Sequence, residues 1–330
     1  MSVAEPIPVT VLSAGGTIAM AGVGGGRGVS PELDGDALVA AVPGLGAVAG
    51  LRVRSLLNCP SAQLTGAQAL GIAQAAVEEA GRGRGVVVTH GTDTLEEVAY
   101  LADLLYGGAT PVVFTGAMRP ATAAGADGPA NLLDATAVAA ASAACDLGVV
   151  VVFGGEVHAA RAVRKADSTS RSAFQSPRLG PLGRIEEGRV RVEGSVARLP
   201  PIAATRLDAR VPIVPAALGD DGLFVDAALD AGADGIVAVA LGAGHVPPPF
   251  LAALRRAAAR VPVVATVRPK RGAILHDTYA FEGSERDLRD GGMVAAGALT
   301  SAAARIKLLA CLGAGYDRDQ IAAAFAPDDQ

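Results

Sequence analysis

The stretch Val86-Val-Val-Thr-His-Gly-Thr-Asp-Thr-Leu-Glu-Glu97 contains the signals that decide the fold. Its first part, Val86–Thr89, is short, apolar and β-branched, as expected of a strand buried on both faces of a parallel sheet. A glycine turn follows, and Asp93 or Thr94 can cap a helix whose first turn contains Glu96-Glu97, where acidic side chains oppose the helix dipole. A strand that passes through a glycine turn into a helix predicts a βαβ unit.

The same alternation extends in both directions from this stretch. Short apolar runs alternate with longer runs that are rich in Ala, Leu and Glu. The expected strands are Val9–Ser13, Leu51–Leu56, Val86–Thr89, Val112–Thr115 and Val149–Phe153, and the expected helices lie at 67–80, 94–106 and 127–141. This pattern predicts an α/β fold whose larger N-terminal domain has a mainly parallel sheet flanked by helices.

The pattern changes after Pro177. Arg184–Arg198 alternates charged residues with Val and Ile, which predicts an antiparallel β-hairpin that closes the first domain. The proline-containing stretch that follows is typical of a linker, and a second alternation of strands and helices begins at Val211. We therefore expect an N-terminal catalytic α/β domain at 1–198, a linker at 199–210 and a smaller α/β C-terminal domain at 211–330.

Composition narrows the class of protein. The chain is 51% hydrophobic with only 3% aromatic residues, so its core must consist mainly of Ala, Val, Leu and Ile. The net charge of −5, without a basic stripe, argues against a nucleic-acid partner. Three scattered cysteines indicate neither a disulfide framework nor a zinc site. No apolar run is long enough to cross a membrane and the first residues do not resemble a signal peptide, so we expect a cytoplasmic protein.

Two Gly-Thr turns follow expected strands: Gly15-Gly16-Thr17 and Gly91-Thr92-Asp93. Ligands of open α/β sheets bind outside the carboxyl ends of the strands, so both turns could present hydroxyl groups to one small polar substrate. The first turn can also be interpreted as a plain tight turn, or as a phosphate site that lacks both common glycine-rich phosphate motifs. The simple interpretation of the second turn is helix capping, which is compatible with a functional role.

Five motifs carry a more specific signal. They are Gly15-Gly-Thr-Ile-Ala19, Thr89–Glu97, Thr115-Gly-Ala-Met-Arg-Pro120, Ala126-Asp-Gly-Pro-Ala-Asn-Leu132, and Lys165 with the downstream Phe174-Gln-Ser-Pro177. In this order they resemble the bacterial L-asparaginase family, which includes the glutaminase-asparaginases. The resemblance runs nearly end to end. It implies hydrolysis of L-asparagine to L-aspartate and ammonia, with weaker glutaminase activity as a compatible addition, and no metal or organic cofactor.

The resemblance also implies catalytic roles for individual residues. Thr17 matches the nucleophile of the family, which would form an acyl-enzyme. Thr92 matches the second active-site threonine, which Lys165 and Asp93 complete as a triad that handles the proton and the attacking water. Lys165 can act as a base only if burial lowers its pKa, helped by repulsion from Arg161 and Arg164; a solvated surface charge is the simpler interpretation.

The implied substrate site combines several parts of the chain. Ser61 would grip the α-carboxylate, Asp93 would also hold the α-ammonium, and the backbone carbonyl of Ala117 would receive the side-chain amide. The substrate-binding residues that we expect are Gly16, Ser61, Gln63, Thr92, Asp93, Ala117 and Glu285. Glu285 aligns with a glutamate lent by a neighbouring subunit, so the smallest complete unit would be a homodimer, usually within a dimer of dimers. A surface charge is the alternative interpretation of Glu285.

Three departures from the family pattern leave questions open. The loop at 20–31 lacks the tyrosine that assists the nucleophile in better-known members; Arg27 and Ser30 are candidate substitutes, and five glycines between 22 and 28 predict a flexible lid. The family commonly has Ser-Gln-Asp where this chain has Ser61-Ala-Gln63. His245 lies in a segment that often carries asparagines, where it could line the site or be an ordinary loop residue.

These departures keep two other functions open. One is an amidohydrolase on the same scaffold that prefers another amide. The other is a non-catalytic sensor that binds aspartate or asparagine without turnover.

Overall fold

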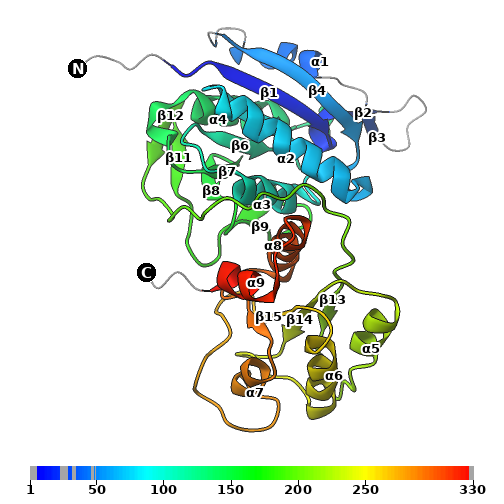
Figure 1. The fold of residues 1–330 in the computed structure, drawn as a ribbon. Coiled ribbons are helices and arrows are strands. Elements are labelled where there is room, and N and C mark those ends of the chain that lie inside the picture. The colour runs from blue at the N-terminus through cyan, green and yellow to red at the C-terminus, as the bar shows by residue number, and fades with distance from the viewer. Residues whose placement is uncertain (1–5, 23–28, 32–34, 46–47, 49, 327–330) are drawn as a thin grey trace. The chain divides into compact units, whose positions relative to one another are not determined.

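A computed structural model of the chain describes residues 6–22, 29–31, 35–45, 48 and 50–326 (Figure 1). The chain divides into two compact units, Met1–Pro201 and Ile202–Gln330. The division falls inside the stretch that we expected to be a linker. Each unit has its own sheet and its own hydrophobic core.

An eight-stranded sheet forms the centre of the first unit, in the order β12-β11-β8-β7-β6-β5-β1-β4. Its strands are β1 (Val9–Gly15), β4 (Arg52–Cys59), β5 (Gly85–Thr89), β6 (Val112–Thr115), β7 (Val149–Phe153), β8 (Glu156–Ala159), β11 (Gly183–Glu186) and β12 (Arg189–Val192). The strands from β4 to β7 pair in parallel, and β8, β11 and β12 add antiparallel pairs. The expected mainly parallel sheet with a terminal hairpin is therefore confirmed.

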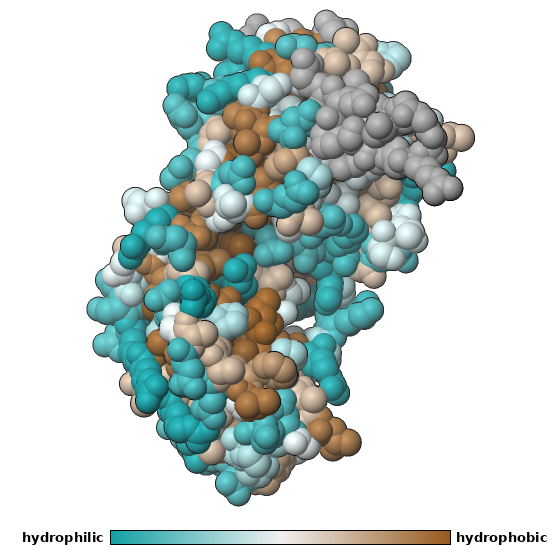
Figure 2. Space-filling model, turned by 90° about the vertical axis from the view of Figure 1, so that its right-hand side faces the viewer, coloured by the Kyte–Doolittle hydropathy of each residue, from teal (hydrophilic) through white to brown (hydrophobic). Residues whose placement is uncertain are grey.

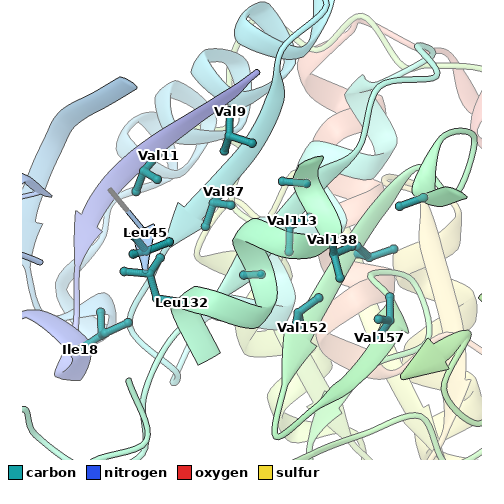
Figure 3. Close-up of a cluster of buried hydrophobic side chains, with 14 of the residues drawn as sticks. Val9, Val11, Ile18, Leu45, Val87, Val113, Leu132, Val138, Val152 and Val157 are labelled. Atoms are coloured by element: carbon teal, nitrogen blue, oxygen red, sulfur yellow. The ribbon is translucent and has the colours of Figure 1, made fainter. Parts of the chain in front are cut away.

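Helices cover both faces of this sheet, and they are α1 (Gly35–Ala40), α2 (Gly66–Gly81), α3 (Leu95–Leu105) and α4 (Gly128–Ala140). On one face, Val11, Val87 and Val113 lie side by side in the sheet register. Figure 3 shows Leu132 and Val138 of α4 among these valines in one cluster of buried side chains. On the other face, Thr10 Oγ1 donates a hydrogen bond to Glu79 of α2 (3.1 Å), and α2 packs against α3.

The strand order changes direction between β1 and β5. From β1 the chain moves outward to β4, and it then resumes with β5 on the opposite side of β1. The chain therefore continues from β1 and from β5 toward opposite edges of the sheet. Such a switch point is where open α/β sheets bind their ligands. Both Gly-Thr turns lie at this point.

The two outermost strands of the large sheet carry alternating arginines. β4 presents Arg52 and Arg54 to solvent, and β12 presents Arg189 and Arg191. The β11–β12 turn contains Glu187 (φ 51°) and Gly188 (φ 71°), and two successive positive φ angles are typical of the tight hairpin turns that match strand twist.

Several short elements complete the first unit. Two small antiparallel pairs form, β2 (Met20–Gly22) with β3 (Val29–Pro31) and β9 (Arg164–Lys165) with β10 (Phe174–Gln175). Short 3-10 turns lie at Thr17–Ala19, Ser61–Gln63 and Ser142–Ala144.

The second unit is a smaller α/β structure with a four-stranded parallel sheet. Its strands are β13 (Ile213–Pro215), β14 (Ile236–Ala240), β15 (Val263–Val267) and β16 (Val294–Ala295), and its helices are α5 (Leu223–Asp230), α6 (Pro248–Ala258), α7 (Glu285–Asp290), α8 (Ser301–Gly313) and α9 (Arg318–Phe325). The expected C-terminal α/β architecture is confirmed.

Figure 2 shows separate hydrophobic patches among hydrophilic residues on one face. Leu218, Leu223 and Phe224 are among the large apolar side chains that are well exposed. Within the described part of the chain, we find no helix that is both long and apolar enough to cross a membrane.

Candidate active site

The two Gly-Thr turns lie against each other. β1 and β5 are neighbours in register, with Ser13 opposite Thr89, so the turns that follow them are adjacent. Gly16 has φ +87°, and a Cβ atom added there would lie only 2.3 Å from the backbone N and Cα of Gly91. No residue larger than glycine fits this contact. Because Gly16 directly precedes Thr17 and Gly91 directly precedes Thr92, the contact brings the two threonines to one point of the sheet edge.

Ser61 joins the same point from the loop after β4. A Cβ atom on Gly91 would lie 2.6 Å from Ser61 Oγ, so this serine packs directly on the second turn. Thr94 Oγ1 donates a hydrogen bond to the backbone oxygen of Ser61 (3.1 Å). Ser61 is buried, and its Oγ has no hydrogen-bond partner among the described residues. By contrast, Gln63 is exposed to solvent.

The loop that contains Ala117 reaches the site from β6. A Cβ atom on Gly116 would lie 3.4 Å from Thr92 Cγ2, so the loop passes beside Thr92, and Ala117 is fully buried. Asn131 Nδ2 donates to the backbone oxygen of Gly116 (3.0 Å). Asp127 accepts hydrogen bonds from the backbone N–H groups of Met118 (3.0 Å) and Arg119 (2.9 Å). The motif at 126–132 therefore fixes the backbone of the motif at 115–120.

Lys165 connects the residues of the second turn. Its Nζ donates to Thr92 Oγ1 (2.9 Å) and forms an ion pair with Asp93 Oδ1 (2.8 Å). The lysine side chain is 19% exposed, whereas that of Asp93 is 64% exposed. The amine is therefore partly shielded, and its role as a base stays a prediction.

Arg161, which lies close to Lys165 in the sequence, forms an ion pair of its own. Arg161 pairs with the buried carboxylate of Asp103 (2.9 Å). The repulsion of Lys165 by Arg161 and Arg164 stays a prediction.

The side chains at the start of α3 are not used for capping. Thr94 occupies the N-cap position, but its hydroxyl donates to Ser61, and Asp93 binds Lys165. The capping interpretation of these side chains is therefore wrong, and both are available to organise the site.

His90 lies between Thr89 and the second turn, in the fully buried interior. Its Nδ1 lies 2.8 Å from the backbone oxygen of Gly91, and its ring lies beside Phe114. Burial lowers the pKa of His90 to about 4, so the imidazole is neutral at pH 7. Sequence reasoning assigned no role to this histidine, because no ligand spacing surrounds it.

Family models match both units of the chain. The model described as Asparaginase, N-terminal covers residues 8–198, and the model described as Glutaminase/Asparaginase C-terminal domain covers 210–325. The chain belongs to the asparaginase family. The resemblance on which the sequence interpretation rested is thereby confirmed.

Individual asparaginases are similar over almost the whole length. The chain is 36% identical to a probable L-asparaginase of Deinococcus radiodurans over 321 residues, with 96% of each chain covered. It is 34% identical to L-asparaginase 2 of Escherichia coli, with 96% of this chain and 92% of the relative covered. The crystal structure of a probable cytoplasmic L-asparaginase from Campylobacter jejuni matches with a TM-score of 0.85 at 30% identity, covering 97% of this chain and 99% of the other.

Glu285 lies in the second unit of this asparaginase-family chain. Its side chain is fully buried, and Oε1 accepts hydrogen bonds from the N–H groups of Tyr279 (2.7 Å) and Thr278 (2.8 Å). His245 Nε2 lies 3.5 Å from Oε2. Burial alone would raise the pKa of Glu285, but the two N–H groups and His245 hold that pKa below its usual value. The interpretation of Glu285 as a surface charge is wrong, and its role toward a neighbouring subunit stays a prediction.

The asparaginase loop that lacks a tyrosine is described only in part. Arg27 and the side chain of Ser30 lie outside the described residues. Their proposed substitution for the tyrosine, and the interpretation of this loop as a lid, stay predictions.

Proposed function

We propose that this chain hydrolyses the side-chain amide of L-asparagine to L-aspartate and ammonia through a threonine acyl-enzyme. The hydrogen bonds from Lys165 Nζ to Thr92 Oγ1 and Asp93 Oδ1 carry the proposal. They join a hydroxyl, an amine and a carboxylate beside the turn that contains Thr17. The names of the asparaginase relatives support asparagine as the substrate.

In the acylation step, Thr17 Oγ1 attacks the amide carbon of the substrate and its proton leaves toward a basic group of the site. Backbone N–H groups of the glycine turns are suited to stabilise the oxyanion that forms. The carbon–nitrogen bond then breaks, and the nitrogen departs with a proton as ammonia, which leaves an ester on Thr17.

In the deacylation step, a water molecule attacks the ester carbon. Thr92 would orient this water, and Lys165 would accept its proton through Thr92. The ester bond breaks, Thr17 recovers its proton, and L-aspartate is released. Ser61, whose hydroxyl packs on the second turn, is suited to bind the α-carboxylate. Asp93 is suited to bind the α-ammonium.

Ammonia release from L-asparagine tests this proposal directly. Wild-type protein should release ammonia, and both Thr17→Ala and Thr92→Ala should abolish the release while circular dichroism shows an unchanged fold. Full activity in either variant would refute the assigned roles.

Gln63 is exposed and stands where the family commonly has Ser-Gln-Asp, and this favours one alternative, an amidohydrolase that prefers another amide. Comparison of kcat/KM for asparagine, glutamine, D-asparagine and larger amides separates the two functions. Asparagine ranking well below another amide would favour the alternative.

Assembly and location belong to the same proposal. We expect a homo-oligomer in which Glu285 of one subunit completes the site of its neighbour, and a cytoplasmic location such as the name of the Campylobacter jejuni relative states for that protein. Light scattering and cell fractionation test these two expectations.

A further inference from the structure

Glu96 contacts the main chain of Lys165. It lies in the first turn of α3, shortly after Thr92 and Asp93, and its carboxylate accepts a hydrogen bond from the backbone N–H of Lys165. Glu96 is partly buried. Burial raises the pKa of this carboxyl group, and the N–H of Lys165 and the nearby Arg164 partly counteract the increase.

The strand that contains Lys165 has few other restraints. β9 consists of only Arg164 and Lys165, which pair with the equally short β10. The next hydrogen bond along the chain runs from Ala166 N to Ala173 O (2.6 Å). A two-residue strand cannot by itself fix the main-chain position from which a long lysine side chain extends. The contact with Glu96 adds a restraint from α3.

We propose that Glu96 is a positioning residue for Lys165, and that it acts by accepting the backbone N–H of this lysine. One segment, Thr92–Glu96, then holds Lys165 at both ends, because Thr92 and Asp93 bind the amine while Glu96 binds the main chain. The inference rests on the proposed function insofar as Lys165 takes part in turnover. A misplacement of about 1 Å in a catalytic group can cost about 100-fold in rate.

A competing explanation is that Glu96 only stabilises the start of α3 by opposing the helix dipole. Any carboxylate in the first turn of α3 would serve that purpose, whatever the length of its side chain. The two explanations differ for two substitutions. Glu96→Asp keeps the charge at the helix start but shortens the side chain by one methylene, whereas Glu96→Gln removes the charge but keeps an oxygen acceptor at the same reach.

Kinetic constants with L-asparagine distinguish these explanations. We expect Glu96→Asp to lower kcat by about 10- to 100-fold with KM changed by less than about threefold, and Glu96→Gln to stay within about threefold of wild type. Glu78→Asp is the matched control, because Glu78 forms an exposed ion pair with Arg82 on another helix. Wild-type kcat in Glu96→Asp would overturn the proposal. Equal impairment in Glu96→Gln and Glu96→Asp would also overturn it.

A second measurement needs no turnover. The sequence contains only three lysines, Lys165, Lys270 and Lys307, so ε-13C-lysine labelling gives three NMR signals, and Lys165→Arg identifies the signal of Lys165. We expect this signal to shift in Glu96→Asp and to keep its wild-type position in Glu96→Gln. An unshifted Lys165 signal in Glu96→Asp would overturn the inference. If wild-type protein releases no ammonia, the proposed function fails while this measurement still tests the contact.

Discussion

The role that we propose for Lys165 needs proton transfer as well as charge. Its amine is partly shielded and contacts both a hydroxyl and a carboxylate. A lysine can release its proton, whereas an arginine stays protonated at any pH that a protein tolerates. An arginine in place of Lys165 therefore keeps the ion pair but removes proton transfer.

We predict that Lys165→Arg lowers kcat for L-asparagine by about 10²- to 10⁴-fold, because the guanidinium group can still pair with Asp93 but cannot act as a base. A coupled ammonia assay measures the loss. Lys270→Arg serves as the control, since Lys270 is exposed on a loop of the second unit. Retention of kcat within a few-fold in Lys165→Arg would exclude proton transfer by Lys165.

His90 predicts a pH dependence of stability. Its pKa is about 4 in the folded protein, against an ordinary value of 6.5, because burial disfavours the charged ring. The unfolded chain therefore binds more protons between these values, so the stability that the neutral ring provides is fully present above pH 6.5 and is lost as the pH falls toward 4. The loss amounts to at most about 3 kcal/mol.

We predict that His90→Asn reduces the difference in unfolding free energy between pH 7 and pH 4.5, because the asparagine amide can donate to Gly91 O but does not titrate. Urea unfolding at both pH values, compared between wild type and variant, measures this difference. An identical pH dependence in both proteins would assign the acid sensitivity to other groups.

The sequence indicated which residues belong to the candidate site better than it indicated their contacts. The motifs named Thr92, Asp93 and Lys165, and the structure joins these three by hydrogen bonds. Glu96 escaped notice because an acidic residue in the first turn of a helix already has an explanation in the helix dipole. Its partner lies far along the chain, and no sequence pattern connects the two. The burial of Glu285 was also missed, because its neighbours in the sequence are mostly charged and suggest an exposed segment.

At the level of elements, runs of β-branched residues predicted the central strands well. The bounds of β6 and β7 agree with the sequence-based expectation to the residue. The two-residue strands β9 and β16 were not predicted, because a periodic pattern needs at least four residues to be recognised. Their pairing depends on tertiary contacts, so the placement of Lys165 could not be read from local sequence.

Helix α4 offers a test of the packing described for the large sheet. Leu132 is 1% exposed in the cluster between α4 and the sheet, whereas the adjacent Leu133 is 41% exposed. We predict that Leu132→Ala lowers the unfolding free energy by about 2–5 kcal/mol, because a cavity forms where packing is lost. Leu133→Ala should cost less than about 1 kcal/mol. Urea denaturation at equal protein concentration compares the two variants, and equal losses would contradict the assigned orientation of α4.

At the level of the whole molecule, the proposed function draws on residues of both units. Thr17, Thr92, Asp93 and Lys165 all belong to the first unit, and Glu285 belongs to the second. This division is compatible with sites that are completed between subunits.

Mixed oligomers test whether Glu285 serves a neighbouring subunit. We predict that Thr17→Ala and Glu285→Gln are each nearly inactive alone, and that co-refolding them in equal amounts restores about one quarter of wild-type activity, because half of the dimers then contain one intact site of two. Ammonia release from the mixture measures the recovery. No recovery in mixtures that form hybrid dimers would place Glu285 outside the neighbouring site.

The arginines on β4 and β12 also bear on self-association. The outermost strands of an open sheet leave N–H and C=O groups that could pair with another chain. Arg54 pairs with Glu79 and Arg191 pairs with Glu186, so we expect Arg52 and Arg189 to supply most of the repulsion of an identical strand that approaches either edge. We therefore expect that exchanging these arginines for valine leaves the candidate site untouched and favours association between the edges of two sheets.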